Sequence, residues 1–144
     1  MRFLGIDYGA KRVGLALSDH AATLARPWQQ VPAGGSPANA ARAVAQVVAD
    51  MRASDDGDID GLVIGLPRRL NGDDTDQTAA VRRFAEDLAR ATTLPVHLQD
   101  ERLTSVEAES RLAVRERDWR KRKAVLDAES AAVLLQDFLD SRTT

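Results

Sequence analysis

The first quarter of the chain consists of short apolar runs separated by small and polar residues, which is the pattern of consecutive β-strands. Residues 2–8 form one such run, and residues 12–18 form a second with alternating apolar and small positions. The stretch 9–11 between them predicts a tight hairpin. A third extended segment covers about 23–31. Pro27 within it indicates an edge strand, because proline cannot donate a hydrogen bond to a neighbouring strand.

The rest of the chain alternates helical periods with apolar runs. Ser36 is a favourable N-cap and Pro37 suits the first helical position, and apolar residues then recur at intervals of three and four up to Met51. The run 62–66 is continuously apolar, as in a strand buried on both faces. The remaining predicted elements are, in order, a helix around 80–88, a strand at 95–98, a helix that starts near Thr104 with a capping-box pattern, and a last helix over 127–139.

This order of elements predicts an α/β fold built on one five-stranded mixed sheet. The first three strands follow one another directly and are expected to pair antiparallel, whereas strands separated by a helix pair in parallel through right-handed crossovers. Helices then flank both faces of the sheet. Because 144 residues fall within the roughly 100–200 residues of one domain, we expect a single domain over residues 1–144.

Three carboxylates stand out because the pattern places them at the sheet rather than on solvated helix faces. Asp7 ends the first strand, Glu101 follows the last strand, and Asp127 shares a helical face with later apolar residues. Ligand sites in open α/β sheets lie beyond the carboxyl ends of the strands, so we expect all three in one cleft. The plainer interpretations are a helix N-cap, a salt bridge or a turn at a strand end.

Carboxylates gathered in one cleft favour a divalent cation, since like charges that close raise one another's pKa unless a cation neutralises them. Oxygen ligands, no cysteine and only two histidines favour Mg²⁺ or Mn²⁺ over zinc. Two such ions about 3.5–4 Å apart can activate a water and stabilise the leaving oxygen of a phosphodiester. The pattern therefore indicates metal-dependent phosphodiester chemistry.

The total charge of −2 argues against a protein that coats nucleic acid, but the distribution of charge changes this interpretation. Residues 115–123, which we call the basic segment, carry a net charge of +4, and the rest of the chain carries −6. The segment ends four residues before Asp127, at the rim of the predicted cleft, where it could clamp a phosphate backbone. Trp119 within it could stack on a base. A solvated helix face and a packing tryptophan are the plainer alternatives.

Four motifs follow one another between Gly5 and about Leu139. They are GIDYG with the following Lys11-Arg12-x-Gly14, Gly65-Leu66-Pro67 with Asn71-Gly72, Asp100-Glu101-Arg102-Leu103-Thr104, and Lys123-x-x-x-Asp127 with Ala131-Ala132. Together they resemble the YqgF/RuvX-like family. The resemblance implies an RNase H-like fold and a metal-dependent endonuclease that processes the 5′ end of pre-16S ribosomal RNA. The family is also described as a candidate Holliday junction resolvase, which would act on four-way DNA junctions.

The resemblance assigns catalysis and metal binding to Asp7, Glu101 and Asp127. Asp100 is the alternative to Glu101, because neighbours in an extended segment point opposite ways and are not expected to share one role. Substrate contacts are expected from Lys11, Arg12 and Arg102, and from Arg120, Lys121, Arg122 and Lys123 of the basic segment. The plainer alternatives are a charged hairpin turn for the first two and an ion pair of Arg102 with a nearby carboxylate.

The expected partner is nucleic acid, either structured RNA or branched DNA, bound by a monomer or homodimer in the cytoplasm. No apolar run approaches the roughly 18 residues of a membrane helix, and the chain opens without a signal-peptide pattern, so no membrane partner is expected. One alternative is a non-catalytic nucleic-acid-binding module, which would have no reason to keep three carboxylates together. Another is a phosphotransferase with a similar Asp-x-Gly hairpin, which normally requires two domains.

Overall fold

The computed structural model describes residues 1–54, 57–67, 71–100 and 119–142, and it describes the side chains of the last range from Asp127 onward. The elements are β1 (Phe3–Tyr8), β2 (Arg12–Ser18), β3 (Ala25–Pro32), α1 (Pro37–Arg52), β4 (Gly61–Leu66), α2 (Asp76–Thr92), β5 (Val96–Asp100) and α4 (Trp119–Arg142). The predicted helix near Thr104 lies outside the described residues. The other predicted elements are confirmed in type and order.

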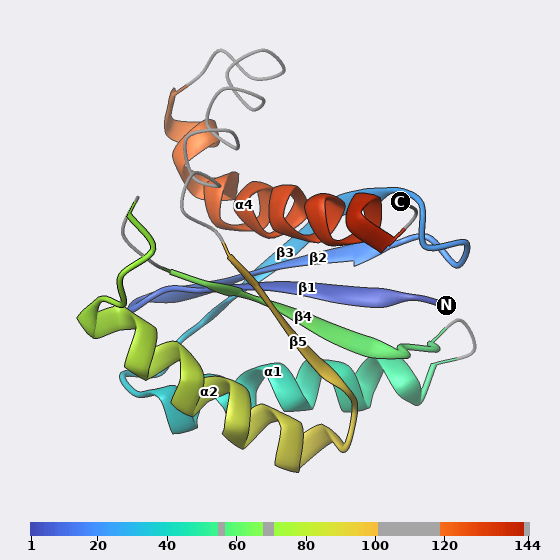
Figure 1. Ribbon diagram of the computed structural model, residues 1–144. Helices are drawn as coiled ribbons and strands as arrows, with labels where there is room; N and C mark the ends of the chain where they lie inside the picture. The colour runs from blue at the N-terminus through green and yellow to red at the C-terminus, as the bar shows by residue number, and fades with distance from the viewer. Residues whose placement is uncertain (55–56, 68–70, 101–118, 143–144) are drawn as a thin grey trace.

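The five strands form one mixed sheet in the order β3-β2-β1-β4-β5. β1, β2 and β3 pair antiparallel, whereas β4 lies parallel to both β1 and β5. Helices α1 and α2 cover one face of the sheet and α4 covers the other (Figure 1). The mixed sheet with helices on both faces is therefore confirmed, and β3 with its Pro27 is an edge strand, as predicted.

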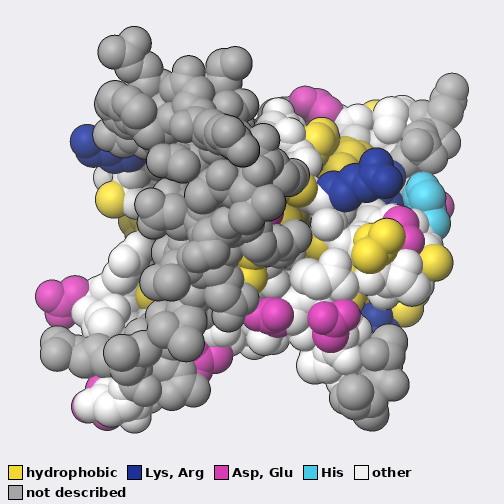
Figure 2. Space-filling model, turned by 90° about the horizontal axis from the view of Figure 1, so that it is seen from above, with side chains coloured by type: hydrophobic (Ala, Val, Ile, Leu, Met, Phe, Trp, Pro, Cys, Tyr) yellow, Lys and Arg dark blue, Asp and Glu magenta, His cyan; other side chains and the backbone are white. Residues whose placement is uncertain are grey.

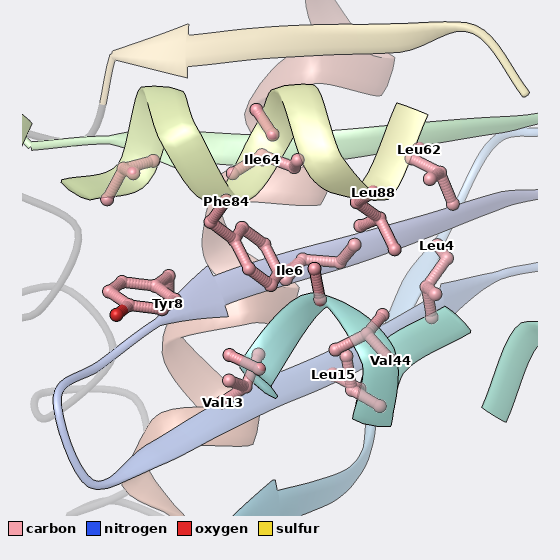
Figure 3. Packing of buried hydrophobic residues seen from close by; sticks show 14 of the residues in the cluster. Leu4, Ile6, Tyr8, Val13, Leu15, Val44, Leu62, Ile64, Phe84 and Leu88 are labelled. Atoms are coloured by element: carbon pink, nitrogen blue, oxygen red, sulfur yellow. The ribbon is translucent and has the colours of Figure 1, made fainter. Parts of the chain in front are cut away.

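The face toward α1 and α2 holds the larger apolar core. Alternate residues of β1, which are Leu4, Ile6 and Tyr8, point into this core, to which α2 contributes Phe84 and Leu88 (Figure 3). The Tyr8 and Phe84 rings lie 5.0 Å apart between centroids. Helix α1 begins as the sequence predicts, because the hydroxyl of Ser36 accepts a hydrogen bond from a backbone N–H in its first turn.

The face toward α4 holds a smaller apolar cluster, to which the sheet contributes Phe3, Ala16 and Val63. Ala131, Leu134 and Leu135 of α4 are buried against this face. A Cβ on Gly5 would lie 2.7 Å from the Cβ of Leu135, so the absence of a side chain at this position allows the helix to approach β1 closely. Seen from the α4 side, neither acidic nor basic side chains dominate the described part of the surface (Figure 2).

Two predicted boundaries were wrong. Helix α4 begins at Trp119 rather than at Asp127, because arginine and lysine are good helix formers and the second half of the basic segment continues the helix instead of interrupting it. Strand β5 extends to Asp100, two residues beyond the predicted end. Among the helices of the described residues, none is long and apolar enough to cross a membrane.

Candidate active site on the α4 face of the sheet

Asp7 lies next to last in β1 and is half-buried. Its neighbours Ile6 and Tyr8 point into the core under α1 and α2, so the alternation of the strand directs Asp7 to the opposite face, which α4 covers. The carboxylate therefore stands at the carboxyl end of a central strand, on the α4 face, as the sequence predicts.

Gly14 of β2 connects Asp7 with the last helix. It is the cross-strand partner of Asp7 in the antiparallel register of β1 and β2. A Cβ on Gly14 would overlap the backbone carbonyl of Asp127, so the backbone of α4 rests directly on this glycine. The structure thereby places Asp7 beside Gly14 and the backbone of Asp127 over it, on the same face of the sheet.

Asp127 lies more than two turns inside α4, which begins at Trp119. It therefore cannot serve as the N-cap of this helix, and that interpretation of the sequence was wrong. The predicted helical face is confirmed, since Ala131, Leu134 and Leu135 pack with Phe3 of β1. The packing of this face holds Asp127 over Gly14 of β2.

Arg12 forms an ion pair with Asp127 that sequence reasoning missed. Its Nε donates to Oδ2 of Asp127 at 3.0 Å, and the two side chains are 46% and 31% exposed. Lys11 is exposed in the hairpin turn, where its backbone carbonyl accepts a hydrogen bond from Ala33 at 2.9 Å. The pairing could not be read from the sequence, because 115 residues separate Arg12 from Asp127; the small residue at Gly14 was the available signal that a helix could approach here.

The position of Asp100 bears on the choice between Asp100 and Glu101. Asp100 pairs in register with Leu66 of β4, whose side chain belongs to the core under α1 and α2. Asp100 therefore stands on the face opposite to Asp7. Glu101 and Arg102 lie outside the described residues. Within the described part of the chain, no three metal-ligating side chains form a cluster.

For the residues of the basic segment that are predicted to contact substrate, the structure describes the backbone only. Arg120, Lys121, Arg122 and Lys123 lie in the first two turns of α4, and their side chains are outside the description. Lys123 precedes Asp127 by four residues, about 6 Å along the helix axis at 1.5 Å per residue. The backbone of α4 thus brings this part of the basic segment close to Asp127.

A pocket of about 440 Å³ lies at the far end of β2, away from Asp7 and Asp127. It is lined by Arg2, Leu17, Ser18, Asp19, Leu24, Arg26, Pro27 and Trp28. Asp19 is engaged by its own loop: the hydroxyl and backbone N–H of Thr23 and the backbone N–H of Leu24 donate to it, which lowers the pKa of Asp19 to about 2. Of the predicted site residues whose side chains the structure describes, none lines this pocket.

Known proteins resemble this chain over nearly its whole length. The family model RuvX, described as a Holliday junction resolvase, matches residues 1–141. A relative from Anaeromyxobacter sp. (strain Fw109-5), named "Putative pre-16S rRNA nuclease", is 42% identical over 99% of this chain and 98% of its own. A relative of the same name from Chloroflexus aggregans (strain MD-66 / DSM 9485) is 38% identical over 96% of this chain and 93% of its own.

Two solved structures share the fold. The structure described as T. thermophilus RuvC in complex with Holliday junction substrate aligns with a TM-score of 0.54 at 14% identity, covering 99% of this chain and 96% of that chain. A second Thermus thermophilus RuvC structure aligns with a TM-score of 0.53, also at 14% identity, and covers 99% of this chain and 96% of that chain. The likeness confirms the predicted RNase H-like α/β fold. With a family model matched over nearly its whole length and relatives about 40% identical, the chain belongs to the RuvX (YqgF) family of nucleases.

Proposed function

We propose that this protein is a metal-dependent endonuclease that processes the 5′ end of pre-16S ribosomal RNA in the cytoplasm. One observation supports the site more than any other: Asp7 and Asp127, which are 120 positions apart in the sequence, flank Gly14 on one face of the sheet. The names of the full-length relatives supply the RNA substrate.

The donor set fits a divalent cation. Asp7 and Asp127 offer the hard carboxylate oxygens that Mg²⁺ and Mn²⁺ prefer, and the guanidinium of Arg12 already places a positive charge against Asp127. In the proposal, Glu101 completes the set, and the position of Asp100 on the opposite face favours Glu101 as that third ligand. The bound metal would activate a water and stabilise the leaving oxygen of the scissile phosphodiester.

The residues around the carboxylates are suited to hold a phosphate backbone. Lys11 and Arg12 are exposed at the hairpin beside Asp7, and the first turns of α4 bring Arg120 to Lys123 near Asp127. Arg102 is proposed to join them. Positive side chains at the rim would position the nucleic acid, because contacts with phosphate fix the register of a nucleic acid without reading its sequence.

Cleavage assays with purified protein test this function. Wild type and Asp7→Asn are compared with Mn²⁺ or Mg²⁺ on a precursor rRNA fragment, a four-way DNA junction and a plain duplex. We expect cleavage of the precursor RNA that requires the metal and is lost in Asp7→Asn. Asp100→Asn is the matched control, because it removes a carboxylate of the other face, and it is expected to retain cleavage. Cleavage that survives in Asp7→Asn would contradict the site.

A second candidate function is resolution of Holliday junctions, which the description of the matching family model favours. In the same assay, preferential cleavage of the four-way junction over the precursor RNA would support it. Because a junction must be cut in two strands, this function also favours a homodimer over a monomer. Light scattering of the free protein and of its junction complex measures that difference.

A further inference from the structure

The ion pair between Arg12 and Asp127 occupies the proposed metal site. Arg12 is the first residue of β2, and it shares the α4 face with Gly14 by the alternation of the strand. Its Nε lies 3.0 Å from Oδ2 of Asp127. One oxygen of a proposed metal ligand is therefore already hydrogen-bonded to a cation of the protein itself.

Arg12 is also close to the other described carboxylate. Asp7 pairs with Gly14 in the register of β1 and β2, so Arg12, two residues before Gly14, is a diagonal neighbour of Asp7 across the strands. Diagonal neighbours are about 7–8 Å apart, within reach of a long side chain. The Arg12 side chain that pairs with Asp127 is therefore also within reach of Asp7.

The ion pair is not needed to hold the helix in place. The backbone of Asp127 rests on Gly14, and Ala131 and Leu134 are buried against the sheet in the following two turns. Both side chains of the pair are partly exposed, and pairs of that kind stabilise proteins little. A weak, replaceable contact at a metal-ligand position suggests a functional role for Arg12 instead of a structural one.

We infer that Arg12 is a positioning residue that exchanges partners: it holds the Asp127 carboxylate before the metal binds and passes to a phosphate of the substrate once the metal occupies that carboxylate. The inference rests on the proposed function, because it takes Asp127 as a metal ligand. Arginine suits both partners, since its planar guanidinium pairs with carboxylate and phosphate through parallel N–H donors.

Two opposite effects of one substitution follow from this exchange. Arg12→Gln removes the cation that competes for Asp127, so we expect it to bind Mn²⁺ about two- to fivefold more tightly than wild type in the absence of nucleic acid. The same variant loses a phosphate contact, so its KM for the precursor RNA should rise at saturating Mn²⁺, and the salt dependence of RNA binding should fall by about one charge.

The experiment measures Mn²⁺ binding by isothermal titration calorimetry, without nucleic acid, for wild type, Arg12→Gln, Arg12→Lys and Arg42→Gln. Arg42 is exposed on α1, on the other face, so Arg42→Gln removes an equal charge and should bind Mn²⁺ like wild type. Arg12→Lys keeps the charge and should return the Mn²⁺ affinity toward wild type, while its KM remains raised because an ammonium lacks the planar donor pair.

The outcomes separate this inference from the proposed function. Unchanged or weaker Mn²⁺ binding by Arg12→Gln, with normal binding by wild type, overturns the partner exchange and leaves the nuclease site intact. An equal gain of Mn²⁺ affinity in Arg42→Gln also overturns the partner exchange, because the gain would then come from the lower total positive charge of the protein. If wild type binds no Mn²⁺ at all, the metal site itself is contradicted. A wild type that binds Mn²⁺ but cleaves none of the substrates contradicts the proposed function, while the affinities still decide the role of Arg12.

Discussion

The two faces of the sheet carry different kinds of side chain, although the same strands contribute to both. On the face toward α1 and α2, β1 contributes Leu4, Ile6 and Tyr8 to one continuous apolar cluster. On the face toward α4, the alternate positions of the same strand include Gly5 and Asp7. Along β1, one face therefore presents large apolar side chains throughout, and the other presents Phe3 followed by a glycine and a carboxylate.

The difference shows how a short strand serves both stability and chemistry. Large side chains under α1 and α2 bury apolar area at close packing, which is the main source of stability. The α4 face has no side chains at Gly5 and Gly14, so the helix backbone can approach the sheet closely. This approach brings Asp127 near Asp7. Adjacent residues of β1 should therefore respond to substitution in opposite ways.

Asp7→Asn should produce the largest effect, and it should act on activity. The substitution removes the charge of a proposed metal ligand while keeping the shape of the side chain, so we expect cleavage of precursor RNA to fall at least about a hundredfold. Even groups that only support a metal ligand are worth 10–100-fold. Thermal unfolding should stay close to that of wild type. Loss of stability comparable to that of a core variant would contradict the division between the faces.

Ile6→Ala tests the neighbouring residue on the other face. Ile6 is fully buried, and truncation of a buried isoleucine costs about 2–5 kcal/mol, so we expect a clear fall in the free energy of unfolding measured with urea. The rate of cleavage well below the unfolding midpoint should remain within about threefold of wild type, because removing one core side chain does not displace the carboxylates. A hundredfold loss of activity in the folded variant would contradict this view.

Gly14→Ala should affect both properties, because the added methyl overlaps the backbone of Asp127. We expect destabilisation of about 1–3 kcal/mol, as for other overpacking substitutions, and weaker Mn²⁺ binding as α4 moves away from β2. Gly5→Ala is the matched control, because its methyl meets Leu135 instead of Asp127. It should destabilise the protein with a smaller loss of Mn²⁺ affinity, and equal losses in the two variants would argue against the special role of Gly14.

Asp19 should give the smallest effect, since its carboxylate stabilises a loop at the opposite end of β2 from Arg12, away from Asp7 and Asp127. The folded-state pKa of about 2 lies below the ordinary value of 3.8, so the stabilisation is complete above about pH 4 and is lost as the pH falls through about 2. Asp19→Asn should lower the unfolding midpoint slightly at pH 7, not at pH 2, and leave cleavage unchanged. An NMR titration that finds an ordinary pKa for Asp19 would contradict this.

Much of this division could be predicted from the sequence. The alternation in β1 and β2 and the apolar run of β4 were sufficient for the sheet, and the charge of Asp7 in an apolar strand indicated the candidate site. The start of α4 was missed, because a run of arginine and lysine is compatible with both a helix and a solvated loop. The ion pair of Arg12 with Asp127 was also missed, since it depends on how two distant segments meet.

The central claim is that the carboxylates of the α4 face form the metal site, and Mn²⁺ binding tests it most directly. Titration calorimetry should compare wild type with Asp7→Asn, Asp127→Asn and Asp100→Asn. We expect the first two variants to lose Mn²⁺ binding and Asp100→Asn, which lies on the other face, to bind like wild type. Wild-type affinity in Asp7→Asn and Asp127→Asn, or its loss in Asp100→Asn, would contradict the claim.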